Sequence, residues 1–80
     1  ETAKNSAEMG NVNSLTDAAV GAQIAYTGVR GGIINVLINL KNIKDRDFIR
    51  EMKSKCEELN SRATDLLYEV NQFVDNKLSN

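Results

Sequence analysis

The chain has 80 residues, with 10 basic and 11 acidic side chains and a net charge of −1. This balance argues against nucleic acid or an anionic membrane as the main partner, because no excess of positive charge is present to drive such binding. The single cysteine excludes an internal disulfide, and the lack of histidine excludes a His-based triad and the common His-containing zinc sites, so no metal site is expected.

The first segment, residues 1–9, is polar and is predicted to form the last turns of a helix that begins upstream. Gly10 suits the left-handed position that ends such a helix. The chain begins with Glu1 instead of methionine, which fits a trimmed or internal piece of a longer protein. A chain of this length buries only roughly 60 to 65% of the surface that its unfolded form exposes, so its core is marginal without outside cover.

Residues 15–42 are predicted to form a long second helix, with Ser14 as its N-cap and Asp17 completing a variant of the capping box. Apolar or small residues occur on nearly every side of this helix, and such helices are normally buried. The predicted helix therefore needs neighbours beyond this chain: the rest of a parent polypeptide, other subunits, or both. A membrane span is disfavoured because Arg30 lies near the centre, where a charge is costly.

Residues 42–45 form a polar turn, and Asp45 is predicted to cap a third helix over residues 46–77. The third helix carries an apolar heptad stripe on one side and charged residues on the others, which is typical of an amphipathic helix. The stripe consists of Ile49, Met52, Cys56, Leu59, Ala63, Leu66, Val70 and Phe73. The predicted fold class is therefore all-α: a long antiparallel helical hairpin that is part of a larger helical bundle.

Three polar residues of the second helix are candidates for ligand binding. Asn35 and Asn39 need partners on a buried helix, and these are either a neighbouring helix or a ligand in a polar cavity. Arg30 either forms a salt bridge or binds the carboxylate of a substrate. Cys56 is predicted to be a small buried hydrophobic residue, because the chain has no histidine that could activate its thiol.

Three ordered segments resemble a known family, the formiminotetrahydrofolate cyclodeaminases and methenyltetrahydrofolate cyclohydrolases. Residues 10–22, GNVNSLTDAAVGA, are similar to its Gly-Asn-x-Asn-Ser-x-Ser-Asp-x-Gly-Val-x-Ala stretch. Residues 32–40, GIINVLINL, resemble its Gly-Ala-Tyr-Leu-Asn-Val-x-Ile-Asn segment, and residues 44–48, KDRDF, resemble its Leu-Lys-Asp-x-x-Phe turn. Thr16 replaces the usual Ser and Ala19 stands where Gly is common, and neither departure breaks the pattern.

The resemblance implies that residues 1–80 are the C-terminal fragment of one helical cyclodeaminase-like domain. The glycine-rich folate-binding segment near the start of the family's domain, Pro-x-Pro-Gly-Gly-Gly-Ser, does not occur in this sequence, so the fragment alone is expected to be inactive. The implied partners are a tetrahydrofolate derivative, the rest of the parent polypeptide and further copies in a homodimer or higher homo-oligomer. The implied location is cytoplasmic, and no cofactor is implied beyond the folate substrate itself.

The resemblance implies one of two reactions, between which the sequence does not decide. One cyclises 5-formiminotetrahydrofolate to 5,10-methenyltetrahydrofolate with release of ammonia, and the other hydrolyses 5,10-methenyltetrahydrofolate. The cyclisation needs an acid to protonate the departing ammonia. In the segment that resembles the family, Asp17 is the best carboxylate for this role, and Asn13 is the best polar partner beside it. Arg30, Asn35 and Asn39 are the candidate substrate-binding residues. The alternative is a non-catalytic helical dimerisation module, which the heptad stripe of residues 46–77 supports.

Overall fold

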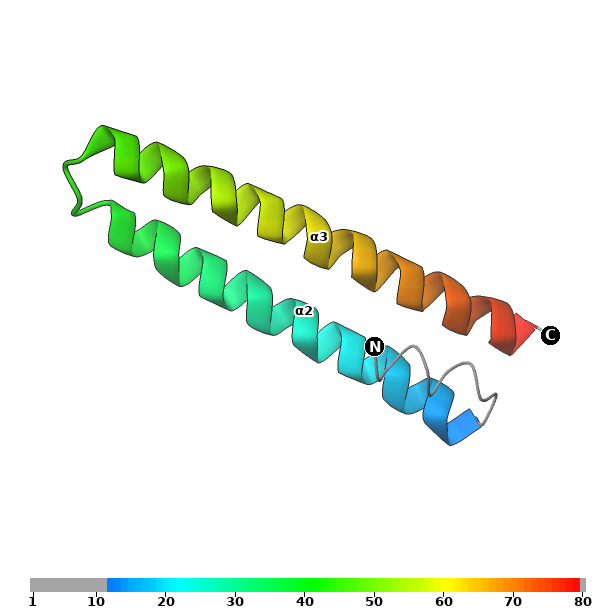
Figure 1. Cartoon of the computed structure of the whole chain (residues 1–80). Coiled ribbons are helices and arrows are strands. Elements are labelled where there is room, and N and C mark those ends of the chain that lie inside the picture. Colours follow the sequence, from blue (N-terminus) through cyan, green and yellow to red (C-terminus); the bar gives the residue numbers. More distant parts are fainter. Residues whose placement is uncertain (1–11, 80) are drawn as a thin grey trace.

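The computed structural model describes residues 12–79 and consists of two long helices. Helix α2 runs over Val12–Leu40 and helix α3 over Arg46–Ser79, and the two lie antiparallel in a hairpin about 53 Å long (Figure 1). No strand occurs among the described residues. The predicted all-α hairpin is thus confirmed, whereas the predicted helix over residues 1–9 and the stop at Gly10 lie outside the described residues.

The start of α2 differs from the prediction. The helix begins at Val12, so Ser14 and Asp17 lie within its first two turns and Ser14 is not the N-cap. The sequence has three polar residues of good capping type within four positions, Asn11, Asn13 and Ser14, and capping preferences among Asn, Asp and Ser differ little. Local sequence therefore could not select one of them, and the helix extends one turn further than expected.

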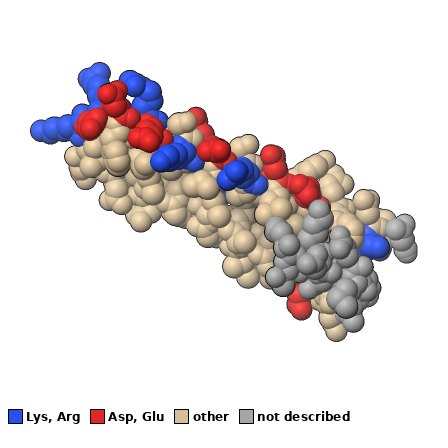
Figure 2. All heavy atoms as spheres, in the orientation of Figure 1, with Lys and Arg blue, Asp and Glu red and all other residues tan. Residues whose placement is uncertain are grey.

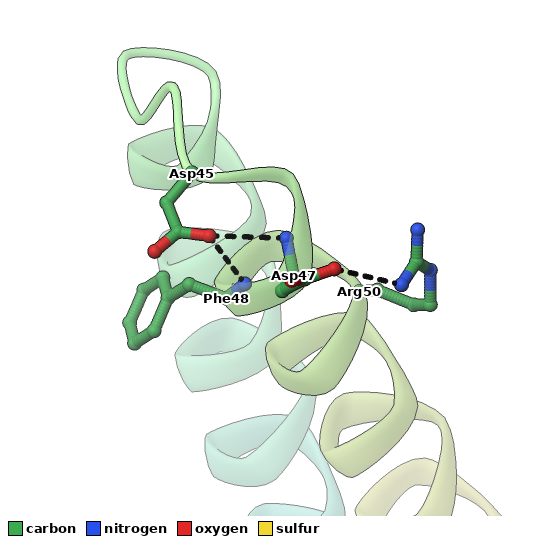
Figure 3. Close-up of polar contacts among 4 residues, drawn as sticks. All are labelled: Asp45, Asp47, Phe48 and Arg50. Carbon is green, nitrogen blue, oxygen red and sulfur yellow. Dashed lines mark hydrogen bonds and ion pairs between the residues drawn. The ribbon is translucent and has the colours of Figure 1, made fainter.

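The turn between the helices agrees closely with the prediction. Asp45 caps α3: its Oδ1 accepts hydrogen bonds from the backbone N–H groups of Asp47 and Phe48, each at 3.1 Å (Figure 3). Asp47 also accepts a bond of 3.1 Å from Nη1 of Arg50, one turn later. The two bonds to Asp45 satisfy backbone N–H groups that a helix start leaves without partners, and α3 begins at Arg46, as predicted.

The end of α2 lies at Leu40, two residues before the expected end. The backbone N–H groups of Lys41, Asn42 and Ile43 donate to carbonyls three residues earlier, at 3.1–3.3 Å. Such bonds tighten the last turn of a helix and satisfy carbonyls that would otherwise lack partners. The chain can therefore reverse direction within a few residues, which sets the two helices side by side.

The best-packed part of the hairpin lies at its open end, away from the turn. Leu15 and Ala18 of α2 form a buried cluster with Val70 and Val74 of α3. Nearer the turn, the buried apolar residues are Ile33, Leu40 and Cys56. The predicted burial of Cys56 as a small hydrophobic residue is confirmed. The interface is narrow, because two helices can bury only the one stripe that each turns towards the other.

The two helices differ in what they leave uncovered. Figure 2 shows the charged side chains gathered along α3 and the turn, whereas other residues form most of the α2 side of that view. Several large aliphatic side chains of α2 are exposed, including Val20, Ile24, Ile34 and Ile38. Neither α2 nor α3 contains a stretch that is apolar and long enough to cross a membrane. The sequence predicted that α2 needs further neighbours, and the hairpin does leave much of its apolar surface exposed. What covers this surface stays a prediction.

Candidate functional site

Asn13 and Asp17 lie at the start of α2, one turn apart. Both side chains are exposed, and their spacing of four residues places them on the same side of the helix. An amide and a carboxylate are thus presented together at the surface near the open end of the hairpin. This geometry leaves the Asp17 carboxylate accessible to a molecule that binds against this end of α2.

Arg30 connects the two helices at mid-length. Its Nη1 donates a hydrogen bond of 3.1 Å to Oδ1 of Asn60 on α3, and the contact is partly buried. The partner is a neutral amide, so the contact differs from the salt bridge that the sequence suggested as one option. A guanidinium has five N–H donors, and a single bond to Asn60 leaves capacity for further acceptors. The bond links α2 to α3 at mid-length and keeps a positive charge close to the hairpin surface.

Asn35 and Asn39 lie one turn apart near the turn end of α2, and both are exposed. Nδ2 of Asn39 donates to the backbone carbonyl of Asn35 at 3.0 Å and lies 3.5 Å from its Oδ1. The bond is therefore local to α2, whereas the two partners considered from the sequence were a neighbouring helix and a ligand in a polar cavity. The pair presents amide groups outward, on a surface that α3 does not cover.

The candidate residues do not form one site within a single hairpin. Asp17 and Asn35 are separated by 18 residues of continuous helix, which corresponds to roughly 27 Å at the rise of an α-helix. Arg30 lies between them and faces Asn60. No small substrate could contact both ends of α2 at once, so the hairpin provides separate pieces of any site that uses all of these residues.

Sequence reasoning missed an apolar groove between the helices. The groove has a volume of about 340 Å³ and lies at mid-hairpin. Tyr26 and Arg62 are the lining residues with polar side-chain groups, and the others are aliphatic or small. Its lining consists of Gly21, Ala22, Ala25, Tyr26 and Val29 from α2 and Leu59, Arg62, Ala63, Leu66, Leu67 and Val70 from α3.

Small side chains on α2 explain the groove. Gly21, Ala22 and Ala25 do not reach across to α3, so Leu59 and Leu66 on the heptad stripe remain about half exposed at the groove. The predicted stripe is therefore buried only in part. The signal that could have found the groove was the row of small residues on the α2 side opposite to bulky leucines on the α3 side.

The glycines of α2 are not used in the contact between the two helices. A Cβ atom added at Gly21, Gly28, Gly31 or Gly32 would meet no atom within 4 Å. Each glycine costs up to about 1 kcal/mol of helix propensity relative to alanine. Close packing against these four positions inside the hairpin therefore does not offset this cost.

Comparison with known proteins relates this chain to folate enzymes. The family described as Formiminotransferase-cyclodeaminase matches residues 1–58. A methenyltetrahydrofolate cyclohydrolase of Methylorubrum extorquens is 36% identical over 73 residues, which are 91% of this chain. Two formimidoyltransferase-cyclodeaminases also match: that of Dictyostelium discoideum at 32% over 71 residues, or 89% of this chain, and that of Rattus norvegicus at 39% over 57 residues, or 71%.

The matches cover only part of each relative. They account for 35% of the Methylorubrum protein, 13% of the Dictyostelium protein and 10% of the rat protein. No solved structure matches the chain at a significant level. The family match extends from the segment before α2 into α3 and includes the whole turn with its Asp45 cap.

Proposed function

Because this chain belongs to the formiminotransferase-cyclodeaminase family, we propose that it is part of a folate one-carbon enzyme whose substrate is a tetrahydrofolate derivative. The observation that carries this proposal is the family match over residues 1–58, together with relatives that are named for folate reactions. The hairpin supplies two helices of the enzyme's helical domain. On its own it is inactive, because the rest of the parent polypeptide completes the substrate site.

The proposed reaction is either the cyclodeaminase or the cyclohydrolase step. The relatives carry both names, so their similarity supports the substrate class without selecting the step. The cyclodeaminase step forms the one-carbon bridge between two nitrogens of the folate and the cyclohydrolase step opens it, and neither requires a metal or a cofactor beyond the substrate. The enzyme acts as a homodimer or higher homo-oligomer in the cytoplasm.

Asp17 is the proposed catalytic residue. Its exposed position at the start of α2 lets a bound substrate approach the carboxylate, and Asn13 lies on the same side of the helix one turn earlier. In the cyclodeaminase reaction, the Asp17 carboxylate would take up the proton that the attacking folate nitrogen loses and pass it to the departing ammonia, and Asn13 would hold a polar group of the folate. A positioned general acid contributes about 10²- to 10⁴-fold to a rate.

Arg30, Asn35 and Asn39 are the proposed substrate-binding residues. The Arg30 guanidinium, which uses one nitrogen on Asn60, is suited to pair with a folate carboxylate. The amides of Asn35 and Asn39 offer donors and acceptors to the polar edge of a ring system. Because these residues lie far from Asp17 along α2, other parts of the assembly must complete the site.

The decisive experiment is to assay the full parent protein with formiminotetrahydrofolate and with methenyltetrahydrofolate. Asp17→Asn is expected to lower kcat by about 10²- to 10⁴-fold while leaving the circular dichroism spectrum unchanged. Asp65→Asn, at an exposed acid of α3, is the matched control and is expected to retain full turnover. A fully active Asp17→Asn enzyme would remove Asp17 from this role.

One observation favours the second candidate, a helical dimerisation module without catalysis. The exposed aliphatic residues of α2 form an apolar surface of the kind that marks protein–protein contacts. Titration of the parent protein with tetrahydrofolate separates the candidates. Saturable binding supports the enzyme, whereas a scaffold would bind none and would still self-associate.

A further inference from the structure

The groove at mid-hairpin has the composition of a small-molecule site. Its volume of about 340 Å³ lies at the lower end of the range for ligand pockets, which combine an apolar lining with a few polar groups. Leu59 and Leu66 remain 50 and 43% exposed along it, so the hairpin leaves apolar side chains for a ligand to cover. The hydroxyl of Tyr26 and the guanidinium of Arg62 are the polar side-chain groups of the lining.

Arg62 selects the charge of whatever occupies the groove. Glu58 lies four residues before it and Asp65 three residues after it on α3, at spacings that allow ion pairs. The Arg62 guanidinium pairs with neither of them and makes no hydrogen bond within residues 12–79. Its side chain lines the groove instead. A carboxylate attached to an apolar group in the groove would therefore meet a guanidinium that is free to bind it.

Polar groups lie beyond both ends of the groove on the α2 side. Asp17 precedes Gly21 by one helical turn, and Asn35 follows Gly21 by roughly four turns, so all three share one side of the helix. A further helix lying along the groove would have to supply partners for the Asp17 carboxylate and the Asn35 amide, because burial without partners is costly. The groove itself spans only roughly 12 Å of α2, from Gly21 to Val29, which suits a ring system.

The proposed substrate contains one segment whose chemistry matches the groove. In a tetrahydrofolate, a pteridine ring is joined through an aminobenzoyl ring to a glutamate. The pteridine carries several hydrogen-bonding groups, most of which this lining would leave without partners. The benzoyl ring is apolar, and one glutamate carboxylate lies only a few bonds from it. An apolar groove with an arginine beside it therefore fits the aminobenzoyl-glutamate half of the molecule.

We propose that the groove binds the aminobenzoyl ring of a tetrahydrofolate derivative and that Arg62 pairs with the glutamate carboxylate nearer to this ring. The proposal rests on the proposed function and adds a binding site to it, formed by both helices of the hairpin. The glutamate has a second carboxylate, so this pairing does not exclude the one proposed for Arg30.

This placement directs the reacting end of the substrate towards Asp17. Asn60 contacts Arg30, so Arg62, two residues further along the antiparallel α3, lies near the level of residue 28 of α2. Asp17 lies roughly 16 Å from that level along the axis, beyond the other end of the groove. The amino nitrogen that takes part in the one-carbon bridge is on the opposite side of the benzoyl ring from the glutamate. With the carboxylate on Arg62, this nitrogen points to the open end of the hairpin, where Asp17 lies.

The first test fills the groove in the full parent protein. Ala25→Leu places a larger side chain in the lining and is expected to raise the KM for the folate substrate about tenfold or more, with kcat changed less than about twofold. Thr27→Leu, at an exposed position of α2 outside the lining, is the matched control, and its KM should stay within about twofold of the original. Circular dichroism should show both variants to be as helical as the unchanged protein, since leucine favours helix.

The second test asks whether Arg62 recognises the glutamate. Two probes, p-aminobenzoylglutamate and p-aminobenzamide, share the ring but differ in the carboxylates, and each is measured as a competitive inhibitor of the parent protein. The unchanged protein should bind the first probe about tenfold more tightly or better. Arg62→Gln should reduce this preference below about twofold, and Arg62→Lys should restore part of it, because lysine keeps the charge without the planar fork.

Arg46→Gln is the matched control for the second test. Arg46 is an exposed arginine of α3 that does not line the groove, so its replacement should leave the preference between the probes unchanged. A merely structural role of Arg62 would weaken both probes equally and would also leave the preference unchanged.

The proposal is overturned if Ala25→Leu raises KM no more than Thr27→Leu does, or if Arg62→Gln keeps the preference for the glutamate probe. A helix of the parent polypeptide would then be the occupant of the groove. A parent that turns over folate with an indifferent groove contradicts only this proposal. A parent that binds no tetrahydrofolate overturns the proposed function and, with it, the groove as a folate site.

Discussion

The two helices have similar lengths, but α3 exposes mainly charged side chains and α2 exposes mainly apolar ones. In α3, one side packs and the others carry charge, so the surface that the hairpin exposes is one that water solvates well. In α2, Asp17 and Arg30 are the only charged residues, and aliphatic side chains point outward on the side that α3 leaves uncovered. The hairpin therefore leaves a largely charged surface on α3, whereas α2 is covered on one side only and exposes aliphatic side chains on the other.

The largest effect on stability is expected on the side of α2 that packs against α3, in comparison with the side that is exposed. Leu15→Ala removes a buried side chain at the open end of the hairpin and should lower the free energy of unfolding by about 2–5 kcal/mol. Ile24→Ala, on the outer side, should cost less than about 0.5 kcal/mol when the chain is diluted to monomers. Urea denaturation monitored by circular dichroism measures both, and equal losses in the monomer would contradict the uncovered outer side of α2.

A smaller effect is expected at the start of α3, where one residue defines the helix end. Asp45→Ala removes the acceptor for the N–H groups of Asp47 and Phe48 and should cost about 1 kcal/mol. Asp45→Asn keeps a capping oxygen and is the control, with most of the stability retained. If the alanine variant unfolds at the same urea concentration as the original, the cap does not stabilise α3.

The contact between the helices at mid-length should contribute an amount similar to that of the cap. A double-mutant cycle with Arg30→Ala and Asn60→Ala is expected to give a coupling of about 0.5–1.5 kcal/mol, the usual range for one hydrogen bond that is partly buried. The cycle requires all four proteins and the same denaturation measurement. A coupling near zero would show that Arg30 does not fix the register of the two helices.

The smallest effect is expected on the charged outer side of α3. Glu51 and Lys55 form an ion pair of 3.6 Å one turn apart, and both side chains are well exposed. Glu51→Gln should change stability by less than about 0.5 kcal/mol and should lose even this effect in high salt. A loss above 1 kcal/mol would mean that this side of α3 is covered in solution, against the contrast drawn between the helices.

The local pattern of the chain predicted much of the fold. The heptad stripe of residues 46–77 and the Asp45 cap specified α3 almost to the residue, because a periodic helix with one strong cap leaves few alternatives. The start of α2 was placed three residues late, because Asn11, Asn13 and Ser14 are all suitable caps. The ordered segments around residues 10–22, 32–40 and 44–48 were enough to suggest the family, which the comparisons then showed.

The candidate site could be predicted only as a set of residue types. Asp17, Asn35 and Asn39 were chosen for their chemistry, and sequence spacing alone already separates them along a rigid rod. Which side of that rod meets α3 was not apparent, since three sides of α2 carry apolar or small residues and any of them could have packed. The groove at Gly21, Ala22 and Ala25 was missed for the same reason.

The sequence by itself determined that two long helices form, where they turn and that α2 is too apolar to lie bare, because helix periodicity, caps and charge patterns act over short distances. Only the tertiary structure decided which side of α2 meets α3, that Arg30 bonds to Asn60 and that the aliphatic side chains on the other side of α2 stay uncovered. These facts depend on the rotation of one helix against the other. That rotation is set by how all the contacting side chains fit together, and no single residue encodes it.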